Sequence, residues 1–360
     1  MFHYEKEAKK TEKKEIAASG CYTRLEMGRP FILISAEDAI FKSFFPGHQK
    51  RLNRLFRWTR VGGRAIRAEF KRELARAEGL ITTWDSPRFD DELLRLAPQL
   101  RIISHCGGEV KSRFSPRLFN RLTITNAAAP MARATAEMGA ALLLYCARNI
   151  DFYRSALREQ TNRIYDEVHL HGAPETLVGQ TVAMIGFGRI GRALVALLRG
   201  FDLSWLVYDP YASSSLVKKY PVRFASLDQV LKNARLLVLT AALTDETRGL
   251  LGKKNLACLP DGATVINIAR GGLIDLEALR KEVQRGRLRC ALDVTDPTEP
   301  LPVDDSLRTM PGAIVTPHVA GSGRRVRQEI ARVVIDDLER FFSGKRVENR
   351  VTASMLARMT

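Results

Sequence analysis

Three residues in the second half of the sequence have side chains that together suit the reduction of a carbonyl group. Arg270 lies in "INIARGG", Glu299 in "TEPLP" and His318 in "TPHVAGS". A histidine titrates near neutral pH and can give a proton to a carbonyl oxygen. A carboxylate beside it orients the imidazole, and an arginine binds a substrate carboxylate or polarises the carbonyl. The sequence therefore suggests His318 as the acid/base, Glu299 as its partner and Arg270 as the anion clamp.

Each of these residues alone has a structural interpretation. A histidine after a proline is usually structural, a glutamate in a Pro-rich loop is usually solvated, and an arginine after a strand is usually in an ion pair. The catalytic interpretation rests on their joint position. All three follow predicted parallel strands of one sheet, at the edge where open α/β sheets bind ligands.

A glycine-rich turn earlier in the chain predicts a dinucleotide site. Gly186, Gly188 and Gly191 follow an apolar strand and open the helix "RIGRALVALLR". Glycines let the backbone approach a pyrophosphate, and the N-terminus of a helix offers free N–H donors. Asp209 ends the next predicted strand, 18 positions after Gly191, where an acid accepts hydrogen bonds from the adenosine ribose. A turn that packs helix on strand without a ligand is the structural alternative.

The acid at position 209 also bears on the choice of cofactor. Its carboxylate would repel a 2′-phosphate, so NAD is favoured over NADP. The nearby Ser213, Ser214 and Ser215 could accept a phosphate, so NADP stays an alternative.

The elements that must position these groups alternate between strand and helix, which predicts two doubly wound parallel sheets. In the second half the predicted strands are 181–185, 204–208, 236–240, 263–267, 289–293 and 313–316, with helices at 189–199, 226–233, 253–258 and 275–285. In the first half the predicted strands are 31–35, 79–83, 100–105 and 122–126, with a short helix at 90–98 capped by Asp90. One long helix is predicted at 134–157, a loop at 161–178, and a last helix at 324–344 that ends at Gly344.

This order predicts a Rossmann dinucleotide-binding domain inserted into a flavodoxin-like substrate domain, with the active site in the cleft between them. Residues 1–27 are rich in Lys and Glu and are interpreted as a disordered tail, with Met27 as an alternative start. The predicted bounds are 28–131 for the first substrate-domain segment, 132–316 for the Rossmann domain, 317–344 for the returning segment and 345–360 for a C-terminal tail.

Composition excludes several classes of protein. The chain has 360 residues, 45% of them hydrophobic, which is enough for two buried cores and too apolar for a disordered protein. The longest apolar stretch is too short to span a membrane, and the N-terminus has no apolar signal region. The default location is therefore the cytoplasm. The five cysteines form no C-x-x-C pair, so neither a disulfide framework nor a metal site is predicted.

The net charge of +17 raises the question of nucleic acid. Arginines recur at 51, 54, 57 and 60, then at 64 and 67, and again at 324, 325 and 327. The sequence has neither zinc-finger spacing nor an aromatic-rich RNA-binding signature. We interpret the arginines as solvated basic faces and expect no specific nucleic-acid partner.

Taken together, the motifs resemble those of the D-isomer-specific 2-hydroxyacid dehydrogenases. The matching stretches are "GFGRIG", "LTDETRGLLG", "INIARGGLID", "ALDV…TEPLP" and "TPHVAGS", and the resemblance runs from about Gly79 to Arg340. It implies a catalytic trio of Arg270, Glu299 and His318. The chain is then an NAD-dependent oxidoreductase that interconverts a D-2-hydroxy acid and its 2-oxo acid. An NAD(H)-sensing, corepressor-like binding protein of the same superfamily is the alternative.

The resemblance also implies the binding residues and the assembly. Cofactor contacts are implied for Gly186, Gly188, Arg189, Ile190, Gly191, Asp209 and Asp293. Backbone N–H groups of "HCGGEV" would meet the substrate carboxylate, which makes Cys106, Gly107 and Gly108 candidates. The small-molecule partner is then a 2-oxo or 2-hydroxy acid, and the implied assembly is a homodimer that involves the 134–157 helix.

Two departures from the family pattern concern the loops. Ala242 stands where the family often has a proline, and "CGGEVKS" replaces the usual G-x-G-x-D. Glu109 would place a negative charge near the expected anion site, which Lys111 could offset. Relatives that oxidise formate carry a glutamine in place of Glu299, so formate is not the expected substrate.

Overall fold

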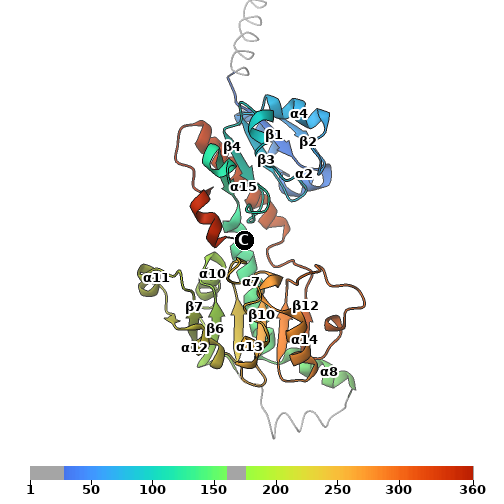
Figure 1. The fold of residues 1–360 in the computed structure, drawn as a ribbon, viewed down its shortest axis with the longest axis vertical. Helices are drawn as coiled ribbons and strands as arrows, with labels where there is room; N and C mark the ends of the chain where they lie inside the picture. The colour runs from blue at the N-terminus through green and yellow to red at the C-terminus, as the bar shows by residue number, and fades with distance from the viewer. Residues whose placement is uncertain (1–27, 160–175, 360) are drawn as a thin grey trace, which may run out of the picture. The chain divides into compact units, whose positions relative to one another are not determined.

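The structure is a computed structural model that describes residues 28–159 and 176–359, in two compact units. The first unit holds the described residues up to Ala127 and Arg327–Ser354, and the second holds Ala128–Val326 and the residues from Met355 onward (Figure 1). The predicted tail 1–27 and most of the predicted loop 161–178 lie outside the described residues. Within the described ranges, no helix combines the length and apolar character that crossing a membrane requires.

The first unit is built on a sheet of six described strands in the order β2-β1-β3-β4-β5-β13. Its pairs are parallel except that β13 runs antiparallel to β5. The order of the first five strands is the flavodoxin-like one. The strands are β1 (Phe31–Ser35), β2 (Arg57–Val61), β3 (Gly79–Thr82), β4 (Ile102–His105), β5 (Thr123–Asn126) and β13 (Arg350–Val351).

Strands β1, β3 and β4 are buried along their whole length. This is the pattern of a parallel sheet covered on both faces. The helices of this unit are α2 (Asp38–Phe44), α3 (Gln49–Leu55), α4 (Ala68–Ala75), α5 (Leu93–Leu96), α6 (Leu118–Arg121) and most of α15 (Arg324–Phe342).

The second unit contains a sheet of seven described strands in the order β8-β7-β6-β9-β10-β11-β12, all parallel. This is the Rossmann order, which reverses between β6 and β9. The strands are β6 (Gln180–Ile185), β7 (Leu203–Tyr208), β8 (Arg223–Phe224), β9 (Leu236–Leu239), β10 (Thr264–Asn267), β11 (Arg289–Leu292) and β12 (Ala313–Val315).

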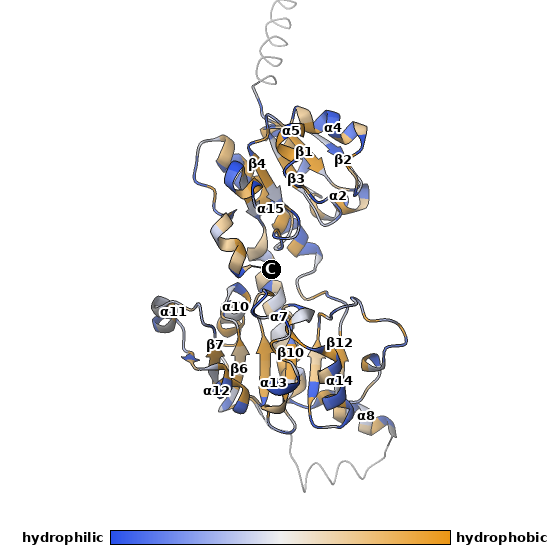
Figure 2. Cartoon of the chain, viewed as in Figure 1, coloured by the Kyte–Doolittle hydropathy of each residue, from blue (hydrophilic) through white to orange (hydrophobic). Residues whose placement is uncertain are grey.

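Alternate residues of these strands enter two separate cores. Val182 and Met184 of β6 belong to one core, and Ala183 and Ile185 belong to the other. The central strands are accordingly coloured hydrophobic in Figure 2. The helices are α7 (Ala128–Ala147), α8 (Ile150–Glu159), α10 (Arg189–Leu197), α11 (Ser214–Lys219), α12 (Leu227–Lys232), α13 (Lys253–Ala257) and α14 (Leu276–Gln284), with 3₁₀ turns η1 (Gly271–Leu273), η2 (Ser306–Arg308) and η3 (Ala353–Arg358).

Local sequence explains where several helices begin and how closely they pack. Ser226 and Gln229 form a capping box at the start of α12, and Asp275 caps α14 by accepting from Ala278 N–H. Helix α7 packs against α10, β9 and β10. Gly139 permits this approach, since a Cβ there would lie 2.6 Å from Ile268 Cδ1.

The predicted fold class is confirmed, and the strands that were predicted agree with the structure to within two residues. The predicted single helix 134–157 is wrong. The chain forms α7 and α8 with a break between them, where Asn149 adopts a positive φ of 49°. The predicted helix 90–98 is a short α5 whose N-cap is Glu92; Asp90 instead accepts from Glu92 N–H.

The division of the chain also differs from the predicted bounds. The first boundary lies at 127/128 instead of 131/132, and the second at 326/327 instead of 316/317. The segment 345–360 is not a simple tail, because it supplies β13 and η3. A two-residue strand at a sheet edge has too few side chains to leave a periodic pattern in the sequence.

Candidate active site

His318 and Glu299 lie next to each other in the loops that follow β12 and β11. His318 Nδ1 is 2.7 Å from Glu299 Oε2. The other carboxylate oxygen, Oε1, accepts from Thr295 N–H at 3.1 Å. With Nδ1–H donating to the carboxylate, Nε2 is left to exchange a proton, and no hydrogen bond between described residues uses it. The His318 side chain is 46% exposed, so this nitrogen belongs to an accessible group.

Asp293 builds the loop that carries His318. This carboxylate is 1% exposed and accepts from Thr316 Oγ1–H at 2.6 Å and from Val319 N–H and Ala320 N–H at 2.9 Å. Its own carbonyl accepts from His318 N–H at 2.8 Å. His318 has a φ of 53°, a left-handed backbone that is uncommon outside glycine. The loop bonds hold it there, so Asp293 acts within the protein as a positioning residue.

Arg270 follows β10 and is held by its neighbours. Asn267 Nδ2–H donates to Arg270 O at 2.9 Å, and Arg270 Nη1–H donates to Ala269 O at 2.7 Å. The next residue, Gly271, lies so close to the backbone of Thr295 that a Cβ would overlap it. Because Thr295 N–H also binds Glu299, these backbone contacts connect the Arg270 loop to the Glu299–His318 pair.

All three residues of the predicted trio therefore follow adjacent strands, since β10, β11 and β12 are neighbours in the sheet. Their loops leave the carboxyl edge, as the sequence predicted. Sequence reasoning missed the groups that fix the trio, namely Asn267 and Thr295. Asn267 stands in the recognised "INIARGG" stretch. The residue type alone does not show that its side-chain amide accepts from Ala269 N–H and donates to Arg270 O.

The glycine turn is at the same edge, after β6. Gly186 has a φ of 89°, and a Cβ there would overlap the backbone of Ala241. Thr240 Oγ1–H donates to Gly186 O at 2.5 Å. Gly188 is the N-cap residue of α10, and no described side chain caps this helix end. A Cβ on Gly188 would meet nothing within 4 Å. None of the hydrogen bonds between described residues uses the N–H groups of Arg189 or Ile190, as in a helix N-terminus that is open to a phosphate.

Asp209 lies beside this turn and is bound to it. Its Oδ2 accepts from Phe187 N–H at 2.7 Å, and its Oδ1 accepts from Tyr211 N–H at 2.9 Å. Each carboxylate oxygen has a second lone pair that can accept a hydroxyl. The turn, the helix terminus and the acid together fit a dinucleotide.

In the first unit, the loop after β4 has the form of a small anion site. Ala127 N–H donates to Gly107 O at 2.9 Å, and Asn126 Nδ2–H donates to Gly108 O at 2.8 Å. The carbonyls of Gly107 and Gly108 are thus bound, whereas no hydrogen bond between described residues uses their N–H groups. Successive free N–H groups of this kind can bind an anion.

Cys106 fits that role less well. Its N–H donates to Thr82 O at 2.7 Å, and its side chain is fully buried. Burial raises the pKa of the Cys106 thiol well above its usual range. The carboxylate of Glu109 accepts two hydrogen bonds from Ser112, one from its N–H and one from its hydroxyl, both at 2.7 Å. The opposite charge comes from Arg113, whose Nε lies 4.0 Å from Glu109 Oε2, and not from Lys111 as the sequence suggested.

His105, just before this loop, is a buried titratable residue that the sequence analysis did not single out. It is 1% exposed, and its Nδ1 lies 2.9 Å from Thr82 Oγ1. Nε2 has no hydrogen-bond partner among the described residues. Burial lowers the pKa of His105 to about 3, with a smaller contribution from Arg113. A Cβ on Gly107 would lie 2.6 Å from Nε2, so the neutral ring packs directly against the backbone of this loop.

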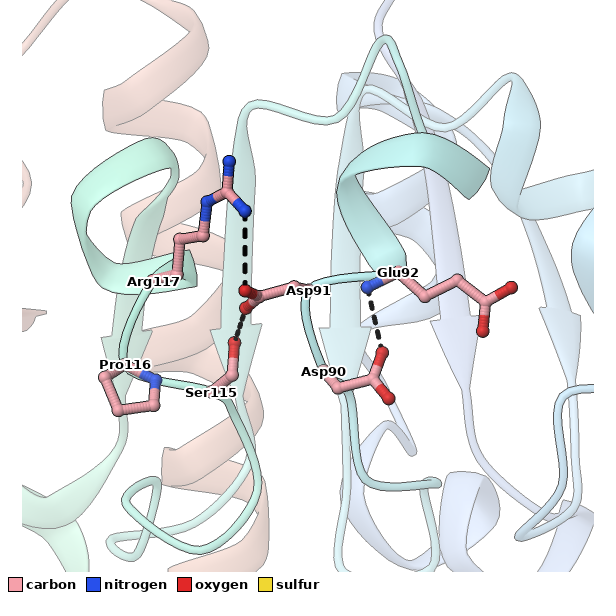
Figure 3. A pocket seen from close by; sticks show the side chains of 6 residues that line it. All are labelled: Asp90, Asp91, Glu92, Ser115, Pro116 and Arg117. Carbon is pink, nitrogen blue, oxygen red and sulfur yellow. Dashed lines mark hydrogen bonds and ion pairs between the residues drawn. The ribbon is translucent and has the colours of Figure 1, made fainter.

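A surface hollow of about 560 Å³ in the first unit contains none of the candidate residues. Figure 3 shows Asp91 bound to Ser115 and Arg117 across it, the latter at 3.6 Å. These contacts join the segments after Phe89 and Phe114, which form a β-bridge. The hollow is lined by Asp90, Asp91, Glu92, Ser115, Pro116 and Arg117. Within the described ranges, no group of His, Cys, Asp and Glu side chains is arranged to hold a metal ion.

Comparison with known proteins gives the relatives of this chain. A sequence model described as "D-isomer specific 2-hydroxyacid dehydrogenase, NAD binding domain" matches residues 140–320. A D-3-phosphoglycerate dehydrogenase of Archaeoglobus fulgidus is 28% identical over 287 residues, which are 79% of this chain and 53% of that protein. A glyoxylate reductase of Pyrococcus furiosus is 29% identical over 271 residues, covering 74% of this chain and 80% of that protein.

One solved structure illustrates the shared fold. A D-isomer specific 2-hydroxyacid dehydrogenase of Xanthobacter autotrophicus Py2, in complex with NADPH and MES, superimposes with a TM-score of 0.72 at 23% identity, over 90% of this chain and 99% of that one. The chain spans about half the length of the D-3-phosphoglycerate dehydrogenases that it matches. With the sequence model matched over half of its residues, this chain belongs to the D-isomer-specific 2-hydroxyacid dehydrogenase family.

Proposed function

We propose that this chain is an NAD-dependent oxidoreductase that interconverts a D-2-hydroxy acid and its 2-oxo acid. The observation that supports this most is the contact of 2.7 Å between His318 Nδ1 and Glu299 Oε2. This pair lies at the same edge of the sheet as the glycine turn. A proton donor and a dinucleotide turn are therefore at the carboxyl ends of the strands of one domain.

In the reducing direction, Nε2 of protonated His318 gives its proton to the carbonyl oxygen of the substrate. Glu299 holds Nδ1–H and stabilises the imidazolium before transfer. Arg270 binds the substrate carboxylate and polarises the carbonyl. When bound, NADH supplies the hydride that the carbonyl carbon takes up. Oxidation reverses these transfers, with neutral Nε2 accepting the hydroxyl proton.

The residues proposed to hold the cofactor are Gly186, Gly188, Arg189, Ile190, Gly191 and Asp209. The helix N-terminus favours the pyrophosphate, and the negative Asp209 favours a free ribose over a 2′-phosphate. NAD is therefore the proposed cofactor. The relative from X. autotrophicus was solved with NADPH, so NADP is the alternative to test. Asp293 is a weaker candidate for direct contact, because three donors of the His318 loop already occupy its carboxylate.

For the substrate carboxylate we propose the free N–H groups of Gly107 and Gly108. The bond to Gly107 O fixes the peptide plane that carries Gly108 N–H. Small 2-oxo acids are the substrate class that such a site and an arginine suit. The names of the matched relatives point to glyoxylate and D-3-phosphoglycerate as the first compounds to try.

The test is a panel of glyoxylate, hydroxypyruvate and pyruvate with NADH, and of D-3-phosphoglycerate with NAD, followed at 340 nm. We expect turnover of at least one compound, and a loss of about 1,000-fold or more in His318→Asn. Asparagine tolerates the left-handed backbone at this position better than alanine does. Binding of NADH without turnover of any compound would contradict the proposal and favour the NAD(H)-sensing binding protein.

A homodimer is proposed from the surface of α8. Ile150, Phe152 and Leu157 are exposed apolar residues on this short helix, and Leu157 is 71% exposed. Ile150 and Leu157 are seven residues apart and therefore share one face of α8, and exposed apolar residues grouped on one face mark sites of association. Light scattering should give twice the chain mass for the wild type and the single chain mass for Ile150→Asp/Leu157→Asp. A monomeric wild type at micromolar concentration would contradict the proposal.

A further inference from the structure

A hydrogen bond crosses the carboxyl end of β6 beside the glycine turn. Tyr211 Oη–H donates to Glu246 Oε2 at 2.6 Å. Tyr211 follows β7 and Glu246 follows β9, and these strands are the two neighbours of β6. Neighbouring strands lie about 4.8 Å apart, so β7 and β9 are about 10 Å apart with β6 between them. The bond therefore joins the loops on the two sides of the glycine turn.

The tyrosine side of this link is anchored at its backbone and at its ring. Tyr211 N–H donates to Oδ1 of Asp209, the acid beside the turn, at 2.9 Å. The guanidinium of Arg358 lies 4.6 Å from the Tyr211 ring centroid, a cation–π contact. Arg358 comes from η3, and the residues from Met355 onward belong to the same unit as Tyr211. Tyr211 thus keeps one orientation although it is 50% exposed.

The glutamate side is held by its own loop. Thr244 N–H donates to Thr247 Oγ1 at 2.8 Å, and Thr247 Oγ1–H donates to Ala242 O at 2.7 Å. Glu246 lies within this turn. The hydrogen bond to Glu246 raises the pKa of Tyr211, so the hydroxyl stays protonated and donating at neutral pH. Both ends of the link are therefore positioned before any ligand arrives.

We propose that the Tyr211–Glu246 bond is a strut that holds the two loops bordering the adenosine half of the dinucleotide at their binding distance. The inference rests on the proposed function only in requiring that the domain binds a dinucleotide. A loop that is already ordered does not have to be ordered on binding, so a preformed strut improves affinity. Tyr211 and Glu246 are then positioning residues for the cofactor, and Arg358 supports the tyrosine ring.

The experiment is a double-mutant cycle read by calorimetric Kd for NADH and for ADP-ribose, which lacks the nicotinamide. We expect Tyr211→Phe to raise both Kd values about three- to tenfold, the range of one net hydrogen bond. In a Glu246→Ala background the same change should leave both Kd values within twofold. Turnover at saturating NADH should not change.

The matched control is Tyr220→Phe. The Tyr220 ring packs on Phe187 of the same turn, but no hydrogen bond between described residues uses its hydroxyl, so its Kd values should match the wild type. Tyr211→Phe within twofold of the wild type, or an equal effect in both backgrounds, would overturn the strut. These outcomes are separate from the proposed function, because a wild type that binds NADH but reduces no 2-oxo acid still yields the Kd comparison.

Discussion

Glu299 reaches His318 with one carboxylate oxygen and Thr295 N–H with the other. This division fixes the role of each oxygen. The oxygen on Thr295 sets the orientation of the carboxylate, and the oxygen on Nδ1 fixes the imidazole with its proton on Nδ1 and its lone pair on Nε2. A substitution that keeps the size of the side chain but changes its donors tests this arrangement.

In Glu299→Gln the amide oxygen is expected to keep the bond from Thr295 N–H. The amide NH₂ then faces His318 Nδ1, which forces the wrong tautomer and removes the charge that stabilises the imidazolium. We predict that kcat falls about 10- to 100-fold, whereas the Kd for NADH from a fluorescence titration stays within twofold. A variant that keeps more than half of kcat would show that Glu299 does not act through His318.

Asp209 is predicted to read the adenosine ribose. Asp209→Ala removes the negative charge that disfavours a 2′-phosphate, and it also removes acceptors for Phe187 N–H and Tyr211 N–H. Both dinucleotides can lose affinity through the second effect, so the ratio of the Kd values is the informative quantity. We expect the preference for NADH over NADPH to narrow about tenfold or more, in line with the loss of a charge-assisted hydrogen bond. An unchanged ratio would exclude this role.

The loops after β10 and β11 meet where Gly271 touches the backbone of Thr295. In Gly271→Ala the new methyl group needs these backbones to separate, and overpacking of this kind costs about 1–3 kcal/mol. We predict a lower thermal midpoint together with reduced kcat, because Arg270 and Glu299 move apart. The control is Gly200→Ala, where a Cβ meets nothing within 4 Å. Equal midpoints for the two variants would contradict the close approach.

Acid stability of the first unit should depend on His105. The pKa of this residue is lowered to about 3 from 6.5 by burial, so between these pH values the unfolded chain binds a proton that the folded chain does not. Its stabilising contribution is complete above about pH 6.5 and is lost as the pH falls toward 3. His105→Asn keeps a polar group toward Thr82 without this titration. We predict that its urea midpoint falls less between pH 7 and 4.5 than that of the wild type, and an equal fall would contradict it.

Long apolar strands and the loops after them could be predicted from the sequence, because fully buried parallel strands leave continuous apolar runs. The edge strand β2 was missed: it reads "RWTRV", and its arginines hide the pattern. The break before α8 was missed because Asn149 supplies the turn without glycine or proline. The trio could be predicted as residue types on one edge, but Asn267, Thr295 and Asp293 act through backbone bonds that no spacing reveals.

Some of the arginines that give the chain its net charge of +17 form contacts within the fold. Arg51, interpreted as a solvated residue of a basic face, instead pairs with Asp336 and Glu339 of α15 and is only 27% exposed. Arg60 donates to Ala36 O at 3.0 Å. These arginines fasten the surface elements of the first unit to its sheet and last helix. Arg51 and Arg60 of the basic run therefore have structural roles that require no nucleic acid.

In the proposed reaction of the whole molecule, a dinucleotide on the second unit gives a hydride to a 2-oxo acid. This transfer can be followed with NADH that carries deuterium at the transferring position of C4, using the better of hydroxypyruvate and pyruvate as substrate and chiral mass spectrometry of the product. We predict a D-2-hydroxy acid with deuterium on C2, and no product from His318→Asn in the same time. A product without deuterium on C2, or of the L configuration, would contradict direct hydride transfer by a D-specific enzyme.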